Sequence, residues 1–434
     1  MQHSLKESIQ NSHSYKAYRM YFSSRLVVLM LTIFLFHVVI VSCEALFMIY
    51  CEHSLKNQKI PEINPSLEKL FLASDTAKVF ESQAKIAGKW AIKRAASILI
   101  KSFDFIVIIA FFSHGIRNWL MPAARSFKGI IKINSSHMSV ADNTYLCLSL
   151  LALGMKSVVA EWIIVSKQDY VDLLLNTFIQ LCRCLLVAPI LVWLFSSVYN
   201  KTKYGLILAA YMSIIILILI SNCTSILPDS VEGMDIIPAK ELGPELYTEL
   251  VRLKLENKIY WDQEAKGENA ALVKTGASKY ILVMGDLLKY GKKEFISFIA
   301  HEVGHADDQS TEKKLLASIL GLGLTCGCML GVLHVIVPKY ERRGVSPFSV
   351  VVFLLMANMY IFSGLTNMFY NNLYILSEVN ADIYAKKLGF GSSLANGLYR
   401  LMIDNSASLF HSTIYTYYAQ DHPAVSSRVA YLNK

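Results

Sequence analysis

EFISFIAHEVGH, residues 294–305, is the stretch from which the rest of the chain can be placed. It ends in two histidines, His301 and His305, that are four positions apart. On a helix this spacing puts both imidazoles on one face, about one turn apart, where they can bind a single Zn²⁺. Glu302, the next residue, can reach a water bound to that metal. It can take a proton from this water, because zinc lowers the pKa of bound water to about 7. The pattern indicates a zinc hydrolase; two surface histidines on an amphipathic helix are the alternative.

A zinc hydrolase needs a third protein ligand and an open fourth position. The segment SEVNADIYA, residues 377–385, offers Glu378 and Asp382. Their four-residue spacing places both carboxylates on one helical face. We therefore expect Glu378 to bind the metal and Asp382 to accept a hydrogen bond from a ligating histidine. A pair of carboxylates on a solvated helix is the alternative.

The composition is that of an integral membrane protein. Of the 434 residues 54% are hydrophobic and only 17% are charged, and the mean hydropathy is +0.40. The formal charge of +9 comes from scattered basic residues, which suits anionic lipid surfaces better than nucleic acid. The eight cysteines form no CxxC pair and lie mostly in apolar runs, which is typical of small core residues rather than of disulfides.

Long apolar runs predict seven membrane spans. They lie at about 26–50, 95–120, 143–165, 171–199, 204–227, 314–337 and 347–370. Several charged residues fall inside these runs, namely Lys101, Asp104, Lys156, Glu161, Asp172 and Arg183. A charge in hydrocarbon costs at least about 2.5 kcal/mol, so these side chains should either pair within the helix bundle or face a hydrated cavity.

The runs divide the chain into an N-terminal membrane region at 1–227, a zinc-protease segment at 228–313, two further spans within 314–371 and a C-terminal helical segment at 372–434. Within the zinc segment, Asn269–Val273 and Lys279–Met284 predict a short hairpin whose edge can pair with an extended peptide. Two spans separate the histidines from Glu378, so the three side chains return to one membrane face. We therefore predict a mainly α, polytopic membrane protein with a small α+β zinc-protease subdomain.

This layout resembles the type I CaaX prenyl proteases, which are integral-membrane zinc metalloproteases. The resemblance includes Asn269-Ala270 at the first strand, Gly285–Leu288 after the second, and the C-terminal segment DHPAVSSR at 421–428. It implies seven helices that form a barrel around a large water-filled chamber. It also implies one Zn²⁺ per chain, and the residues that carry this chemistry are Glu302 as the general base and His301, His305 and Glu378 as the ligands.

Four further residues are expected to contribute to binding or catalysis. We expect Asn269 to hydrogen-bond the substrate backbone and Asp382 to support a ligating histidine. His422 is expected to stabilise the oxyanion, and Arg428 either to assist it or to bind the terminal carboxylate of the substrate.

The activity that the resemblance implies is removal of the last three residues from a C-terminal Cys-a-a-X whose cysteine is isoprenylated, whether by farnesyl or by geranylgeranyl. The implied location is the membrane of the endoplasmic reticulum or the inner nuclear membrane, with the site open to the cytosol. The implied partners are prenylated proteins and membrane lipid, without nucleic acid. Two alternatives stay open: a quality-control metalloprotease that cuts unfolded or translocon-stalled proteins, and a non-catalytic membrane scaffold with structural zinc.

Overall fold

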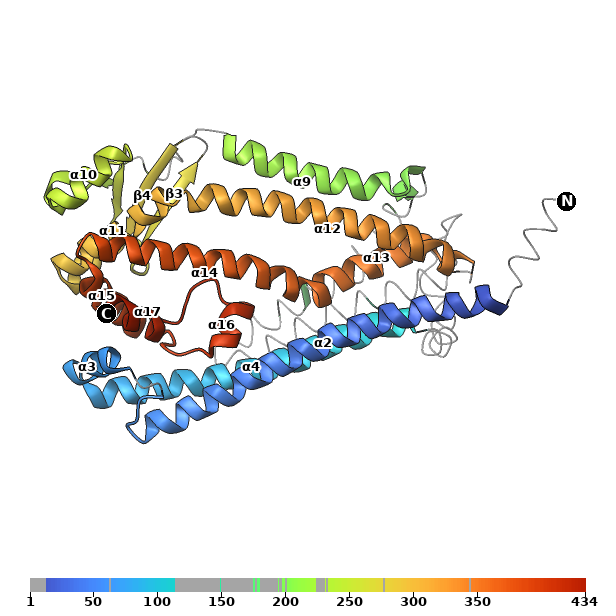
Figure 1. Ribbon diagram of the computed structural model, residues 1–434, viewed down its shortest axis with the longest axis horizontal. Helices are drawn as coiled ribbons and strands as arrows, with labels where there is room; N and C mark the ends of the chain where they lie inside the picture. Colours follow the sequence, from blue (N-terminus) through green and yellow to red (C-terminus); the bar gives the residue numbers. More distant parts are fainter. Residues whose placement is uncertain are drawn as a thin grey trace. The chain divides into compact units, whose positions relative to one another are not determined.

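The computed structural model describes residues 13–61, 64–113, 201–223, 233–275, 278–342 and 345–434, with Val231 and a few isolated positions between 149 and 199. Over these residues the chain is mainly helical and has one small sheet (Figure 1), which confirms the predicted fold class. Apart from isolated positions, the spans predicted at 143–165 and 171–199 lie outside the described residues. The same holds for the charges at Lys156, Glu161, Asp172 and Arg183.

Four helical segments of the described chain are long and apolar enough to cross a membrane. They are Arg25–Lys56 within α2 (His13–Lys56), α4 (Thr76–Phe112), α12 (Ser310–Glu341) and Pro347–Lys387. The shorter α9 (Gly205–Cys223) is also apolar. α4 begins well before the predicted start at residue 95, because no proline interrupts the segment and its alanines and lysines favour a helix. The total of seven spans stays a prediction.

The last predicted span continues directly into the segment that carries Glu378. α13 (Pro347–Ala357), a π-helical turn at Asn358–Phe362 and α14 (Ser363–Lys387) follow one another without a break. Proline suits the first position of α13, since its missing N–H would find no partner within the helix there. The run ends before Gly389, whose φ of +87° suits the left-handed turn after a helix. A continuous helical segment therefore holds Glu378.

The sheet contains the predicted hairpin and two strands that were not predicted. Its order is β1-β2-β4-β3, with β1 at Asp235–Ile236, β2 at Ile259–Asp262, β3 at Asn269–Thr275 and β4 at Ser278–Met284. β3 and β4 pair antiparallel, with Asn269 opposite Met284. β1 and β2 were missed because runs of two and four residues carry too little alternation to be recognised. Within the described sheet β3 is an edge strand.

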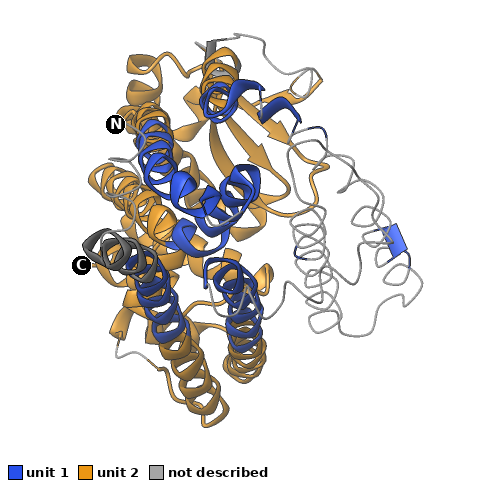
Figure 2. Ribbon diagram, turned by 90° about the vertical axis from the view of Figure 1, so that its right-hand side faces the viewer, with its two compact units in different colours: residues 1–41, 95–211, 323–364 blue, residues 42–94, 212–322, 365–434 orange. Residues whose placement is uncertain are grey.

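The chain forms two compact units, each assembled from segments that are far apart in sequence (Figure 2). One contains residues 1–41, 95–211 and 323–364, and in its helical core Phe111 stacks on Phe353 with 3.9 Å between ring centroids. The other contains residues 42–94, 212–322 and 365–434, and it includes the sheet. The predicted division of the sequence at 227, 313 and 371 stays a prediction.

The sheet-containing unit holds the remaining helices. They are α3 (Pro65–Ala73), η4 (Ala239–Leu242), α10 (Pro244–Arg252), η5 (Leu287–Tyr290), α11 (Lys292–Asp307), α15 (Gly391–Asp404), α16 (Thr413–Ala419) and α17 (Val425–Leu432). α11 packs on α15, and α15 packs on α17. Apart from α16, these helices share one apolar core with the sheet, and Leu246, Ile281 and Ile299 are fully buried in it.

Candidate metal centre

α11 carries the two histidines and is buried along most of its length. It begins after Gly291, whose φ of +118° lets the chain turn from η5 into the helix. Ile299, Ala300 and Val303 have no exposed surface. Burial of a large aliphatic side chain contributes about 1.5–3 kcal/mol, so packing on these faces fixes the orientation in which α11 presents its histidines.

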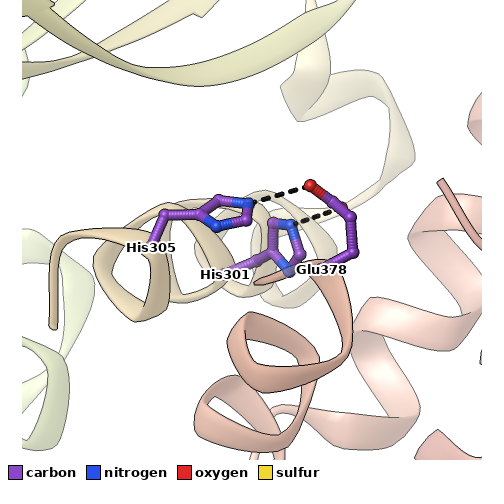
Figure 3. A group of neighbouring side chains, drawn as sticks. All are labelled: His301, His305 and Glu378. Carbon is purple, nitrogen blue, oxygen red and sulfur yellow. Dashed lines mark ion pairs between the residues drawn. The ribbon is translucent and has the colours of Figure 1, made fainter. Parts of the chain in front are cut away.

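His301 and His305 converge with Glu378 of α14 (Figure 3). His301 Nε2 lies 3.3 Å from Glu378 Oε2, and His305 Nε2 lies 3.1 Å from Glu378 Oε1. One donor atom from each residue lies within 4.8 Å of the other two. The three side chains are 8%, 11% and 8% exposed, in that order. Two imidazoles and one carboxylate are a donor set of catalytic zinc sites, so the residues present fit this metal.

Gly304, between the two histidines, allows α14 to approach α11 closely. A Cβ at position 304 would lie 2.8 Å from Ala381 Cα and 3.0 Å from Tyr384 Cβ. Ala381 is one helical turn from Glu378, so the missing side chain at 304 determines how near Glu378 comes to the histidines.

A buried charged network lies behind His301. Asp382 Oδ1 is 2.9 Å from His301 Nδ1. Arg428 of α17 donates to the Asp382 carboxylate from Nε and Nη2, at 2.8 and 2.6 Å. Tyr431 donates its hydroxyl to the same carboxylate. A carboxylate in this position fixes the orientation of a ligating imidazole, and its own partners in turn hold the carboxylate in place.

The network also favours positive charge at His301. Burial opposes protonation of the imidazole, but the carboxylates of Asp382 and Glu378 outweigh it and raise the pKa of His301 to about 10. Burial likewise opposes the charge of Arg428, and the same two carboxylates keep its pKa above the ordinary value. Because a ligating imidazole must be neutral, a metal that binds here would displace this proton.

Two serines that were not predicted lie beside His305. Ser377 Oγ is 3.2 Å and Ser310 Oγ is 3.4 Å from His305 Nδ1. Both hydroxyls can therefore fix the orientation of this imidazole. Ser377 adjoins Glu378 in sequence, but a serine in a helix carries no signal of its own that would have identified it.

Glu302 contacts the edge strand of the sheet. Its Oε2 accepts a hydrogen bond of 2.6 Å from the backbone N–H of Leu272 in β3, and its side chain is almost fully buried. The contact holds the carboxylate between the histidine pair and the strand with which a peptide could pair.

The structure brings His422 to the same site. Its Nε2 lies 3.6 Å from Glu378 Oε1, and its Nδ1 lies 2.9 Å from Asp421 Oδ1. The contact with Asp421 raises the pKa of His422, and the charge of Glu378 adds to this effect. With Nδ1 paired, the ring can donate a hydrogen bond from Nε2.

Arg428 and Asn269 are placed differently from each other. Arg428 is buried, its guanidinium is bound to Asp382, and its Nη1 is 3.5 Å from Glu378 Oε2. Asn269 is exposed at the start of β3, where its side chain accepts a hydrogen bond of 3.0 Å from Ala270 N. Asn269 is thus accessible to a substrate, whereas Arg428 is held by protein groups.

A cavity of about 600 Å³ joins these residues. Its polar lining includes Glu302, His422 and Asn269, and Lys314 of α12 also reaches it. An apolar wall completes it, formed by Phe298, Leu398, Leu401, Met402 and Val425. The arrangement places the candidate metal ligands, the carboxylate of Glu302 and an apolar surface in one cavity.

Comparisons with known proteins agree with this geometry. The sequence profile of peptidase family M48 matches residues 243–434, which include every predicted site residue. The "Probable CAAX prenyl protease 1" of Schizosaccharomyces pombe is 26% identical over 164 residues, which cover 35% of this chain and 33% of that protein. The match thus spans about a third of the length of this relative.

A solved structure extends the comparison to nearly the whole chain. The crystal structure of Ste24p from S. mikatae has a TM-score of 0.59 and 16% sequence identity, and the match covers 95% of this chain and 99% of that one. This likeness shows a shared fold. The chain is therefore an integral membrane protein with the fold of Ste24p, and its residues 243–434 match peptidase family M48.

Proposed function

We propose that the chain is a zinc-dependent membrane endopeptidase that removes the C-terminal -aaX tripeptide from isoprenylated CaaX proteins. The observation that carries the proposal is the convergence of His301, His305 and Glu378, with Glu302 held between them and an edge strand. The S. pombe relative is named as a probable CAAX prenyl protease, which supports prenylated CaaX proteins as the substrate class. The proposal includes a location in the endoplasmic reticulum membrane, with the site open to the cytosol.

His301, His305 and Glu378 would hold one Zn²⁺, with Asp382 and the two serines orienting the imidazoles. When bound, zinc would polarise the scissile carbonyl and acidify water at neutral pH.

Glu302 would take the proton from the attacking water and deliver it to the leaving amine. The hydrogen bond from Leu272 N fixes one carboxylate oxygen and leaves the other free for this transfer. Because the donor is part of β3, it would keep the base in a constant position relative to a peptide paired with that strand.

His422 would donate a hydrogen bond to the oxyanion, since Asp421 favours its protonated form. Arg428 is engaged by Asp382 and lies near Glu378, so we assign it the role of positioning these two carboxylates. This differs from both roles expected for Arg428, assistance to His422 at the oxyanion and binding of the terminal carboxylate of the substrate.

The substrate would lie along β3 as an added strand, which gives sequence-independent backbone hydrogen bonds. Asn269 would bind backbone at one end of this interaction. The apolar wall from Phe298 to Met402 would accommodate the aliphatic residues between the cysteine and X.

The test is a paired cleavage assay on the purified, zinc-loaded protein. A farnesylated peptide that ends in Cys-a-a-X should be cut after the cysteine, and its unprenylated twin should be cut far more slowly; a geranylgeranylated twin reports the lipid preference. Equal cleavage of both twins, together with cleavage of an unfolded membrane segment, would contradict the proposal and favour quality-control proteolysis.

A further inference from the structure

A lysine–carboxylate bridge lies at each end of the β3 edge. At the Asn269 end, Lys289 Nζ lies 2.6 Å from Glu268 Oε1 and 3.1 Å from Asp404 Oδ2. At the opposite end, Glu312 Oε1 lies 2.7 Å from Lys279 Nζ and 3.3 Å from Lys274 Nζ. The two bridges differ in what they connect: only the first joins β3 to α15, whose side chains form most of the apolar wall of the cavity.

The Lys289 bridge is one of several contacts that connect η5 to α15. Glu268 lines the cavity immediately before β3, and Asp404 is the last residue of α15. Arg400 of α15 donates to the backbone carbonyls of Lys289 and Tyr290, at 3.3 and 2.5 Å. η5 is thereby fixed to α15 through backbone as well as side chain, and Lys289 extends this connection to the start of the strand.

The direction of a bound peptide follows from strand pairing. Antiparallel pairing is slightly more stable per residue than parallel pairing. Because β3 runs from Asn269 to Thr275, an antiparallel partner has its C-terminus towards Asn269. The residues that follow the scissile bond therefore extend towards Lys289.

The distance along the strand matches the length of the tripeptide. Glu302 meets β3 at Leu272, so the scissile bond lies at about that level. Three extended residues span about 10 Å, which is also the length of β3 from Leu272 back to Asn269. The third residue after the scissile bond thus reaches the point at which Glu268 and Lys289 meet.

We infer that the bridge from Glu268 through Lys289 to Asp404 closes the cavity three residues beyond the scissile bond and thereby determines the length of the released peptide. The inference rests on the proposed function, because it assumes that the site cuts a C-terminal tail. Lys289 acts here as a positioning residue that limits space.

The first test measures cleavage as a function of tail length in the full-length, zinc-loaded protein. The substrates are farnesylated peptides with three, four or five residues after the cysteine. Wild type should prefer the three-residue tail over the five-residue tail by at least about tenfold, since each methylene that a pocket excludes costs about that factor. Lys289→Ala should reduce this ratio to below about threefold, and Lys289→Arg, which can remake both ion pairs, should restore it.

The bridge at the other end of β3 provides the matched control. Lys279→Ala removes the shorter of the two ion pairs of Glu312 and leaves the pair with Lys274, and the tail-length ratio should keep its wild-type value. An unchanged ratio in Lys289→Ala would overturn the inference. So would a ratio that changes in Lys279→Ala instead, because the peptide would then run in the opposite direction.

A binding measurement separates this inference from the proposed function. In the zinc-loaded Glu302→Gln protein, the Kd for the three-residue tail should be at least about tenfold lower than that for the five-residue tail, and adding Lys289→Ala should remove the difference. This pattern without any cleavage by wild type would contradict the proposed function and support the length limit. Equal Kd values for both tails would overturn the length limit, whether or not wild type cleaves.

Discussion

Replacement of Gly304 by alanine tests how the metal centre is assembled. The added Cβ would lie 2.8 Å from Ala381 Cα, whereas ordinary van der Waals contact begins at 3.4 Å. α11 and α14 must therefore separate by about 0.2 Å to reach a tight contact of 3.0 Å and by about 0.6 Å to reach ordinary contact, because the obstructing atom is backbone and cannot rotate away. Glu378 lies on α14 and would move with it.

The consequences for stability and for metal binding differ in size. Alanine is about 1 kcal/mol better than glycine within a helix, and overpacking costs about 1–3 kcal/mol, so the net loss of stability should be at most about 2 kcal/mol. Ligand distances in metal sites stay within about 0.2 Å of their usual values, so a shift of α14 by a few tenths of an ångström should weaken zinc binding by about 10-fold or more, the size seen when groups that support the ligands are changed.

Zinc competition against a chelator of known affinity measures this effect in Gly304→Ala, and thermal unfolding of the same samples reports stability. Gly327→Ala is the matched control, because a Cβ at this helical position would meet no atom within 4 Å. If Gly304→Ala bound zinc within twofold of wild type, the close approach of the two helices would not be what places Glu378.

Three further changes separate the roles of other residues. Glu302→Gln should lower kcat by about 10²–10⁴-fold, because glutamine cannot accept the proton of the attacking water. The variant should still bind one zinc per chain, measured by atomic emission, since the three ligands are unchanged and the glutamine can keep the hydrogen bond from Leu272 N. Near-normal turnover would reject Glu302 as the base. Asp382→Asn leaves the charge of buried Arg428 without its main partner, so the free energy of unfolding, measured in denaturant, should fall by about 3 kcal/mol. Zinc affinity should fall about 10–100-fold, because His301 loses the carboxylate that orients it. Wild-type values for both would show that the network does not support His301. The pKa of Glu249 in α10 is lowered by its hydrogen bond from Tyr384 and by Arg252, so its carboxylate stabilises the fold above the ordinary pKa of 4.5 and this contribution is lost as the pH falls below it. The melting temperature of Glu249→Gln should therefore lie below that of wild type at pH 7, and the difference should narrow as the pH falls below 4.5 and through the lowered pKa; a difference that stays constant down to pH 3 would contradict the assignment.

Helical spacing was sufficient to predict the local part of the site. Positions 301 and 305 had to share a face once they lay in a helix, and the same argument joined Glu378 to Asp382. The even number of spans between the histidines and Glu378 made a common site possible. The hairpin at 269–284 was recognisable because its two strands are apolar and adjacent in sequence.

The rest depends on contacts between distant parts of the chain. The pairing of Arg428 with Asp382 joins residues 46 positions apart, and no local pattern shows that the guanidinium is satisfied within the protein. Ser310 and Ser377 reach His305 only after α11, α12 and α14 have packed. The role of Gly304 depends on Ala381 of α14, which packs opposite it and is distant in sequence.

The most direct measurement is anomalous diffraction at the zinc edge from crystals of the zinc-loaded protein. The account predicts one peak within about 2.0–2.2 Å of a nitrogen of His301, a nitrogen of His305 and a carboxylate oxygen of Glu378, a geometry usual for catalytic zinc. A peak bound elsewhere, or one with Glu378 beyond coordinating distance, would contradict it.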